Sequence, residues 1–254
     1  MNAFGMDRST DSQHASADSE TIAVLFDAVG TLIYPKPPVR DVYWRAGVEL
    51  ESRLTGDEVD WRFRQAVKEH FGQRAALANA AGSELTRPPT NDDLERSTWQ
   101  AVVRTVFSDV DPARQTPLFD RLWQHFAEPQ NWAFFDDAAN VWRQLQRRGL
   151  IIGVASNFDS RLHAVLRQTE LTRDCQHIFA SASVGFSKPD PRFFAEVARR
   201  LNLPPDRIVL VGDDRTNDFD GATNAGWQAV LVDRSTASSN EWQAALERVL
   251  RRLS

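Results

Sequence analysis

Short runs of consecutive apolar residues recur along the chain, and one run lies far from the other four. Such runs are typical of strands in a parallel sheet, because those strands are buried on both faces. We therefore predict five strands in one sheet, the third of which is the weakest because it begins with a histidine. The runs are Ile22–Phe26, Leu150–Ala155, His177–Ala180, Ile208–Val211 and Ala229–Val232.

Helix signals separate the later runs. Arg147 and Arg148 precede Gly149, and cations followed by glycine are typical of a helix C-terminus. Asp190 followed by Pro191 is typical of a helix N-terminus, with a capping carboxylate before a proline. Because strand and helix signals alternate after the long gap, the pattern favours an α/β fold. We expect a Rossmann-like parallel sheet core with helices on both faces.

The segment between the first run and the others has a different pattern. Residues 36–135 contain no convincing strand run, but they contain four sets of apolar positions with helical spacing. We therefore predict a block of helices inserted after the first strand. The four sets are Tyr43, Ala46, Leu50 and Leu54; Val59, Phe63, Ala66, Val67 and Phe71; Trp99, Val102, Val103 and Val106; and Phe119, Leu122, Trp123 and Phe126.

These patterns divide the chain into three parts. We expect residues 1–19 to form a flexible polar tail, residues 20–35 and 136–254 to form the α/β core, and residues 36–135 to form the helical insertion. The insertion holds five of the eight tryptophans. Packing inside a small bundle is one interpretation of these side chains, and the lining of a substrate pocket by one or two of them is the other. The five are Trp44, Trp61, Trp99, Trp123 and Trp132.

Composition narrows the classes of protein. The 254 residues carry a formal net charge of −5, which lacks the basic footprint of a typical nucleic-acid binder. No run of 18 or more apolar residues is present, so we expect no membrane span. Cys175 is the single cysteine and fits a reducing, cytoplasmic location.

Polar residues follow the apolar runs at the points where the predicted strands end. In a parallel sheet, functional groups collect at the carboxyl ends of the strands. Together these residues supply carboxylates, hydroxyls, an ammonium group and glycine-rich turns, which is the composition of a site for a metal ion and a phosphate. They are Asp27, Thr31, Ser156, Asn157, Lys188, Asp213 and Asp218.

The order and spacing of these residues resemble the four motifs of the haloacid dehalogenase-like superfamily. The helical insertion lies where that family carries an α-helical cap domain. Two longer runs, Ser156–Asp159 and Lys188–Pro191, resemble the subgroup that includes haloacid dehalogenase-like hydrolase domain-containing protein 3. The four motifs are Phe26–Leu32, Ser156–Asn157, Lys188–Pro189 and Gly212–Asp218.

The resemblance implies a Mg²⁺-dependent phosphatase that acts on a small phosphorylated metabolite. Asp27 would attack phosphorus and form an aspartyl-phosphate, which water then hydrolyses. Ser156 would donate a hydrogen bond to the phosphoryl group, and Lys188 would neutralise charge on that group and on Asp27. The implied phosphate-binding residues are Ser156, Asn157, Lys188 and Thr31. The implied metal site comprises Asp27, the backbone carbonyl of Val29, Asp213 and Asp218.

One position departs from the family pattern. Phosphatases of the family usually carry a second aspartate two residues after the nucleophile, where this chain has Val29. That aspartate acts as general acid and base, a contribution of about 10²–10⁴-fold. Its absence implies weakened activity, above all on substrates with a poor leaving group. Asp159 and Asp214 are near in sequence, but the sequence does not identify a replacement.

This gap leaves several hypotheses open. The first is a phosphohydrolase weakened or narrowed by Val29, and the second is a catalytically poor phosphate- or partner-binding protein on the same scaffold. A dehalogenase is less favoured because the acidic metal motif is retained. A phosphonate-cleaving enzyme would need a cap lysine, for which the chain offers Lys36 and Lys68.

The sequence names neither the substrate nor the oligomeric state. Specificity in this architecture is expected on the cap. Four residues that follow the first motif closely are weak candidates to reach the site: Tyr34, Lys36, Arg40 and Arg45.

Overall fold

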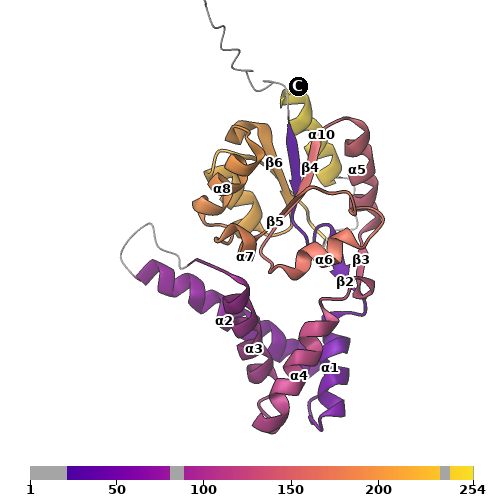
Figure 1. The fold of residues 1–254 in the computed structure, drawn as a ribbon, viewed down its shortest axis with the longest axis vertical. Helices are drawn as coiled ribbons and strands as arrows, with labels where there is room; N and C mark the ends of the chain where they lie inside the picture. The colour runs from indigo at the N-terminus through magenta and orange to yellow at the C-terminus, as the bar shows by residue number, and fades with distance from the viewer. Residues whose placement is uncertain (1–21, 81–88, 235–240, 254) are drawn as a thin grey trace, which may run out of the picture.

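The chain folds into a sheet-containing core and a separate helical lobe, the cap (Figure 1). The structure is a computed structural model that describes residues 22–80, 89–234 and 241–253; the predicted tail, residues 1–19, lies outside them. Among the described residues, no helix has the combination of length and apolar character needed to cross a membrane.

The core is built on a parallel sheet whose strands match the predicted runs. The strand order is β5-β4-β1-β6-β7, so the first strand of the chain lies at the centre of the described sheet. β1 therefore lies directly between β4 and β6, although more than 100 residues separate it from either strand in sequence. The strands are β1 (Ala23–Phe26), β4 (Ile151–Ser156), β5 (His177–Ala180), β6 (Ile208–Gly212) and β7 (Gln228–Leu231).

Helices cover both faces of this sheet, as the sequence predicts for the fold class. Val24 and Phe26 point into the cluster that contains α5 (Asp136–Arg147), α6 (Arg161–Arg167) and α10 (Glu241–Leu253). Ala23 and Leu25 point into the opposite cluster. Because neighbouring strand residues face opposite sides, a strand with helices on both sides must be apolar throughout. The second cluster contains residues of α7 (Ser181–Val184), α8 (Pro191–Leu201) and α9 (Gly221–Asn224), together with Leu203 and Ile208 on either side of the 3₁₀ turn η2 (Pro205–Arg207).

The predicted helix ends of the core are confirmed. The Asp190 side chain accepts a hydrogen bond of 2.9 Å from the Arg192 backbone N–H, with Pro191 as the first residue of α8. Gly149 adopts a φ of +72° just after α5 ends, a conformation that glycine adopts without steric cost.

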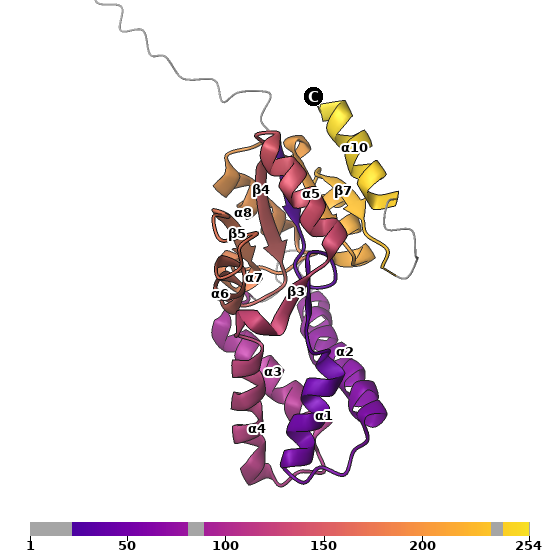
Figure 2. The ribbon, with the colours of Figure 1, turned by 90° about the vertical axis from the view of Figure 1, so that its right-hand side faces the viewer.

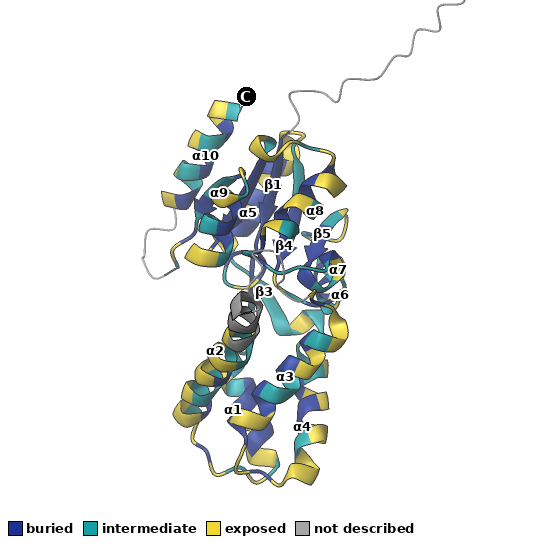
Figure 3. Ribbon diagram, turned by 90° about the vertical axis from the view of Figure 1, so that its left-hand side faces the viewer, coloured by how far each residue is buried: buried dark blue, intermediate teal, exposed yellow. Residues whose placement is uncertain are grey.

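The cap is a bundle of four helices with its own apolar cluster. Exposed residues lie on the outside of the bundle and buried ones face inward, as Figure 3 shows. The first predicted stripe extends too far: α1 ends at Glu49, and Leu54 is buried from the connection to α2 instead. The helices are α1 (Val39–Glu49), α2 (Gly56–Ala80), α3 (Asp92–Val106) and α4 (Pro112–His125).

Two short strands carry the chain between the core and the cap (Figure 2). β2 (Ile33–Pro35) pairs antiparallel with β3 (Trp132–Phe134), and the 3₁₀ turn η1 (Pro129–Asn131) precedes β3. The sequence analysis missed both, since three residues are too few to show a periodicity. The start of α3 makes a second contact with the core, where the Asp92 carboxylate accepts a hydrogen bond of 2.8 Å from the Ser160 N–H.

Candidate active site

The residue that follows β1 is the first member of the site. Asp27 stays in register with the sheet, since its N–H donates to the Val211 carbonyl at 2.8 Å, and the residue is only 8% exposed. The chain then turns tightly, because the Leu32 and Ile33 N–H groups both donate to the Ala28 carbonyl at 2.8 Å. Asp27 is thus a nearly buried carboxylate on a rigid support.

Glycine is required inside this turn. Gly30 has a φ of +93°, and a Cβ atom built there would lie 2.4 Å from Oδ2 of Asp213. Real Cβ atoms essentially never come that close to a neighbour, so any side chain at this position would displace Asp213 or the turn. Gly30 therefore allows the loop after β1 to lie against the loop after β6.

The loop after β6 supplies two more carboxylates. It continues into a π-helical turn, η3 (Arg215–Asp220), whose N-terminus is capped by the Asp214 side chain through the N–H groups of Thr216 and Asn217, each at 2.8 Å. This turn brings Asp218 back toward the strand, where its Oδ2 accepts from the Asp214 N–H at 3.1 Å. Asp213 stays more exposed and Asp218 is buried.

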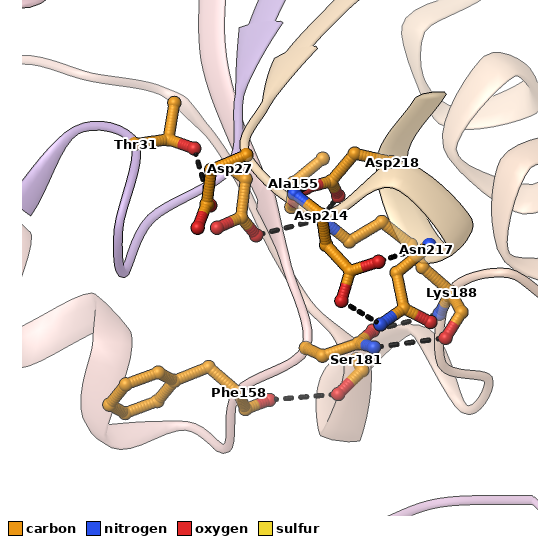
Figure 4. Close-up of polar contacts among 11 residues, drawn as sticks. Asp27, Thr31, Ala155, Phe158, Ser181, Lys188, Asp214, Asn217 and Asp218 are labelled. Carbon is orange, nitrogen blue, oxygen red and sulfur yellow. Dashed lines mark hydrogen bonds and ion pairs between the residues drawn. The ribbon is translucent and has the colours of Figure 1, made fainter. Parts of the chain in front are cut away.

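Lys188 joins the ends of three strands with one ammonium group. Its Nζ donates to Asp27 Oδ1 at 2.7 Å, to Asp218 Oδ1 at 2.5 Å and to the Ala155 carbonyl at 2.8 Å (Figure 4). Its backbone is held by Asn157, whose side-chain oxygen accepts from the Lys188 N–H at 2.8 Å while its amide donates to the Lys188 carbonyl at 2.9 Å. An ammonium group has three protons, so all of its donors are used.

The cluster holds three carboxylates and one ammonium group, and this imbalance of charge affects the pKa values of its members. Burial alone would lower the pKa of Lys188, but Asp27 and Asp218 together raise it. Burial raises the pKa of Asp218 to about 7, and repulsion from Asp27 adds to the effect against the attraction of Lys188. Burial and Asp27 also raise the pKa of Asp213. One ammonium group is shared among three carboxylates, so a further cation would stabilise their charged forms.

The three carboxylates are also close enough to hold such a cation. One oxygen from each of Asp27, Asp213 and Asp218 lies within 4.8 Å of the others. Carboxylate oxygens are the ligands that hard divalent cations prefer, and Mg²⁺ typically binds one or two of them and keeps several waters. The residues present therefore fit a divalent cation in their donor type, their spacing and their excess negative charge.

Two predicted phosphate-binding residues have well-defined surroundings. The Thr31 hydroxyl donates to Asp213 Oδ1 at 2.8 Å, so in this structure it orients a carboxylate. Ser156 is buried at the end of β4, next to Asn157. Val29 is 39% exposed, which leaves its side chain open in the loop that follows Asp27. The structure thus gathers the predicted residues at one edge of the sheet, while their individual roles stay predictions.

The two aspartates near in sequence are engaged elsewhere. Asp214 caps η3, and its second oxygen accepts from the Asn217 amide at 2.8 Å. Asp159 is buried and forms a bidentate ion pair with Arg161, with both N–O distances at 2.7 Å. Each carboxylate is therefore committed to a structural contact that a water-activating base would have to give up.

Sequence analysis missed one residue that supports the first loop. Arg234, which follows β7, donates from Nε to the Gly30 carbonyl at 3.2 Å and from Nη2 to the Thr31 carbonyl at 2.6 Å. Its Nη1 pairs with Asp137 at 2.6 Å. The only sequence signal was an arginine shortly after the fifth apolar run, which is too common to single out. Arg234 is a positioning residue, because it acts through the loop backbone.

A cavity of about 320 Å³ lies between this edge of the sheet and the cap. Val29 and Asn157 line it from the core, and three of the five tryptophans of the insertion, Trp99, Trp123 and Trp132, line it from the cap side. Trp44 and Trp61 are exposed instead. The weak candidates Tyr34, Lys36, Arg40 and Arg45 are not among the lining residues of the described chain, and neither is Lys68.

Comparisons with known proteins agree with this geometry. The family model described as haloacid dehalogenase-like hydrolase matches residues 23–226. Haloacid dehalogenase-like hydrolase domain-containing protein 3 is 28% identical in Danio rerio, over 91% of this chain and 92% of that protein. The Homo sapiens protein of that name is 33% identical over 82% and 80%. A phosphoglycolate phosphatase of Shigella boydii is 26% identical over 82% and 79%.

Solved structures share the fold. A crystal structure of a dehalogenase superposes with a TM-score of 0.63 at 23% identity, covering 91% of this chain and 92% of the other. A Bacillus subtilis hydrolase bound to magnesium superposes with a TM-score of 0.65 at 18% identity, covering 91% and 99%. At these identities the likeness concerns the fold, and both a dehalogenase and a magnesium-bound hydrolase share it.

Proposed function

The chain belongs to the haloacid dehalogenase-like hydrolase family, and we propose that it is a Mg²⁺-dependent phosphohydrolase with Asp27 as its nucleophile. The observation that carries this proposal is the cluster of Asp27, Asp213, Asp218 and Lys188 at the carboxyl ends of β1, β6 and the neighbouring loop. A phosphoryl group brings negative charge to a carboxylate nucleophile, and such a reaction needs cations held at that place.

Mg²⁺ would be held by Asp27 and Asp213, with Asp218 and the backbone carbonyl of Val29 completing the site. When bound, it would reduce the repulsion between the nucleophile and the phosphoryl oxygens. The raised pKa values of Asp213 and Asp218 support a cation here, since both carboxyls are disfavoured as anions without one. The magnesium named for the Bacillus subtilis structure agrees with this choice of ion.

Asp27 and Lys188 would carry the transfer. A carboxylate oxygen of Asp27 forms a bond to phosphorus while the bond between phosphorus and the leaving oxygen breaks. Water then attacks the aspartyl-phosphate, which releases inorganic phosphate and restores the carboxylate. Lys188 holds Oδ1 of Asp27 at 2.7 Å throughout, so the nucleophile is oriented before the substrate arrives. Ser156 and Asn157 would bind the phosphoryl group from the end of β4.

The leaving oxygen must take its proton from solvent or leave as an anion. Val29 stands beside the nucleophile's loop and has no proton to give. Since general acid catalysis is worth about 10²–10⁴-fold, a substrate whose leaving group is already stable as an anion would suffer least. The phosphatase name of the Shigella boydii relative supports the reaction class but does not identify the substrate.

Two other functions remain as outcomes of the test. A dehalogenase would use Asp27 on carbon, and the dehalogenase structures share this fold. The buried acidic cluster around Lys188 argues against it, because a carbon electrophile with a halide leaving group has no use for three carboxylates. A phosphate- or partner-binding protein would keep the cluster and show no turnover.

The test is phosphate release from acetyl phosphate and p-nitrophenyl phosphate with Mg²⁺. We expect turnover that EDTA abolishes and that Asp27→Asn removes, whereas Asp206→Asn, an exposed carboxyl on the far turn η2, leaves it unchanged. Metal-independent chloride release from 2-chloropropionate would establish the dehalogenase instead. Absence of turnover on either class would favour the binding protein.

A further inference from the structure

We propose that the cavity under the cap binds the leaving group of the substrate and that this group is an aromatic ring, so the substrate is an aryl phosphate; this rests on the proposed phosphohydrolase activity. The cavity is about 320 Å³, near the lower end of small-molecule pockets, which run from about 300 to 1,000 Å³.

The cavity begins beside the charge cluster, although Asp27 and Lys188 are not among its described lining residues. Val29 lines it two residues after Asp27, and Asn157 lines it directly after Ser156. The same Asn157 side chain is hydrogen-bonded to both backbone groups of Lys188. A phosphoryl group placed at Asp27 and Lys188 therefore has the cavity as the space next to it, on the side of the cap.

The walls are largely aromatic and pack against one another. Rings pair around the cavity from Tyr43 to Phe63 at 4.9 Å between centroids, and from Phe63 to Trp99 at 6.3 Å. Where the cap meets the core, Trp132 lies 6.0 Å from Phe158. Such rings favour offset or edge-to-face contact with a further ring, which adds to the hydrophobic gain. Eight of the 17 lining residues are aromatic: Tyr43, Phe63, Trp99, Phe119, Trp123, Phe126, Trp132 and Phe158.

The two charged lining groups pair with each other. Asp159 and Arg161 neutralise each other, and the Arg161 guanidinium also donates to the Trp123 carbonyl at 2.9 Å and lies 3.3 Å above the Trp123 ring. Burial raises the pKa of Tyr43, so its hydroxyl stays neutral. The cavity offers few hydrogen-bond partners to the several hydroxyl groups of a sugar, so burying them here costs free energy that an aromatic ring avoids.

The chemistry of the leaving group points the same way. Among the described residues that line the cavity, Asp159 is the one carboxyl group, and both of its oxygens accept hydrogen bonds from Arg161. A phenol has a pKa of about 10, whereas an aliphatic alcohol resembles water at about 15.7. A phenolate therefore leaves without the proton that this cavity does not supply.

The experiment compares substrates that separate size from leaving-group reactivity. Phenyl phosphate and 2-naphthyl phosphate release phenols of similar pKa but differ in apolar area. With Mg²⁺ we expect kcat/KM to be at least about tenfold higher for 2-naphthyl phosphate, because the second ring buries more surface. Octyl phosphate and glucose 6-phosphate should be at least about 100-fold poorer than 2-naphthyl phosphate.

A filled cavity should abolish this preference. Val67 lines the cavity on α2 and Val48 is exposed on α1 outside its lining, so Val67→Trp and Val48→Trp form a matched pair. We expect Val67→Trp to lower the ratio of kcat/KM for 2-naphthyl over acetyl phosphate by about tenfold or more, while Val48→Trp keeps it. An unchanged ratio in Val67→Trp would overturn the proposal.

Binding provides a readout that does not depend on turnover. Three tryptophans line the cavity, so 2-naphthylmethylphosphonate should change the tryptophan fluorescence of Asp27→Asn and bind more tightly than octylphosphonate. Turnover of acetyl phosphate with no naphthyl preference would overturn the aryl proposal and leave the phosphohydrolase intact. Naphthyl binding without turnover of any phosphate would overturn the phosphohydrolase and, with it, the assignment of an aryl phosphate as substrate.

Discussion

The charge cluster at the sheet edge and the cavity under the cap differ in how their side chains are packed. At the sheet edge, charged groups are buried and each contact is specified: Lys188, 3% exposed, donates to two carboxylates and one carbonyl. In the cap, aromatic side chains surround a space that they do not fill. Under the proposed function, the reaction would depend on atoms held at fixed distances, whereas specificity would depend on the shape of an apolar cavity. The same substitution should therefore have different consequences in the two regions.

The largest expected effect concerns the buried ammonium group. Lys188→Met leaves Asp27 and Asp218 without their shared cation, so we expect turnover to fall about 10²–10³-fold. The free energy of unfolding should fall by about 3 kcal/mol, because removal of one member of a buried ion pair leaves the other uncompensated. Phosphate release and urea denaturation would measure the two effects.

A second variant separates the effect on turnover from the effect on stability. Lys188→Met with Asp218→Asn removes one of the two stranded carboxylates, so part of the lost stability should return while turnover stays low. If the double variant were less stable than Lys188→Met alone, the account of the charge cluster would be wrong.

The next largest expected effect concerns the reactivity of the single thiol, Cys175. Burial in the core raises the pKa of Cys175 to about 11 and outweighs the lowering effects of the His177 backbone and of Arg167. Since an exposed thiol has a pKa of about 8.5, its thiolate fraction at pH 8 is about 200-fold larger. We expect Cys175 to react that much more slowly with iodoacetamide than the cap cysteine of Val48→Cys in a Cys175→Ser background.

The pH dependence of the two thiols checks the cause. Below its pKa, a thiol gains about tenfold in thiolate for each pH unit. The Cys175 rate should therefore still rise between pH 9 and 10, where the exposed cap thiol has levelled off. A plateau for Cys175 near pH 9 would contradict a pKa raised by burial.

Two glycines with positive φ test how tightly the sheet edge is packed. Gly30→Ala and Gly149→Ala both place a side chain in the left-handed region, which costs about 1–2 kcal/mol. A Cβ at Gly30 would meet Asp213, whereas a Cβ at Gly149 would meet nothing within 4 Å beyond its own chain neighbours. We expect Gly30→Ala to lose roughly 2 kcal/mol more stability and to lower turnover, with Gly149→Ala fully active. Equal losses would show that the close approach of the two loops is unimportant.

The smallest expected effect comes from enlarging one valine side chain in each of the two regions. Val209 is fully buried in β6, while Val67 borders the cavity. Val209→Phe should cost about 1–3 kcal/mol because a close-packed interior has no room for the ring, and Val67→Phe should stay within about 0.5 kcal/mol. Urea denaturation measures both. A similar cost at Val67 would mean that the cavity closes on itself.

Local pattern was enough to predict much of this protein. Five apolar runs identified five strands, and four apolar stripes identified the helices of the cap, because burial on two faces or on one face leaves a mark along the chain. The residues after those runs, among them Asp27, Lys188 and Asp218, could be selected because strand ends of a parallel sheet meet at one edge. The family followed from their order.

Other features depended on contacts between distant segments. β2 and β3 are too short to show a pattern, and they exist because residues 33–35 and 132–134 meet. The support of the loop after Asp27 by Arg234 is a partnership that no spacing reveals, because about 200 residues separate Arg234 from Gly30 and Thr31. The cavity is the clearest case. The tryptophan content of the insertion was visible in the sequence. Which rings fill the bundle, which face solvent and which line a space beside Val29 was decided only when the cap packed against the sheet, because several separate chain segments together enclose the cavity.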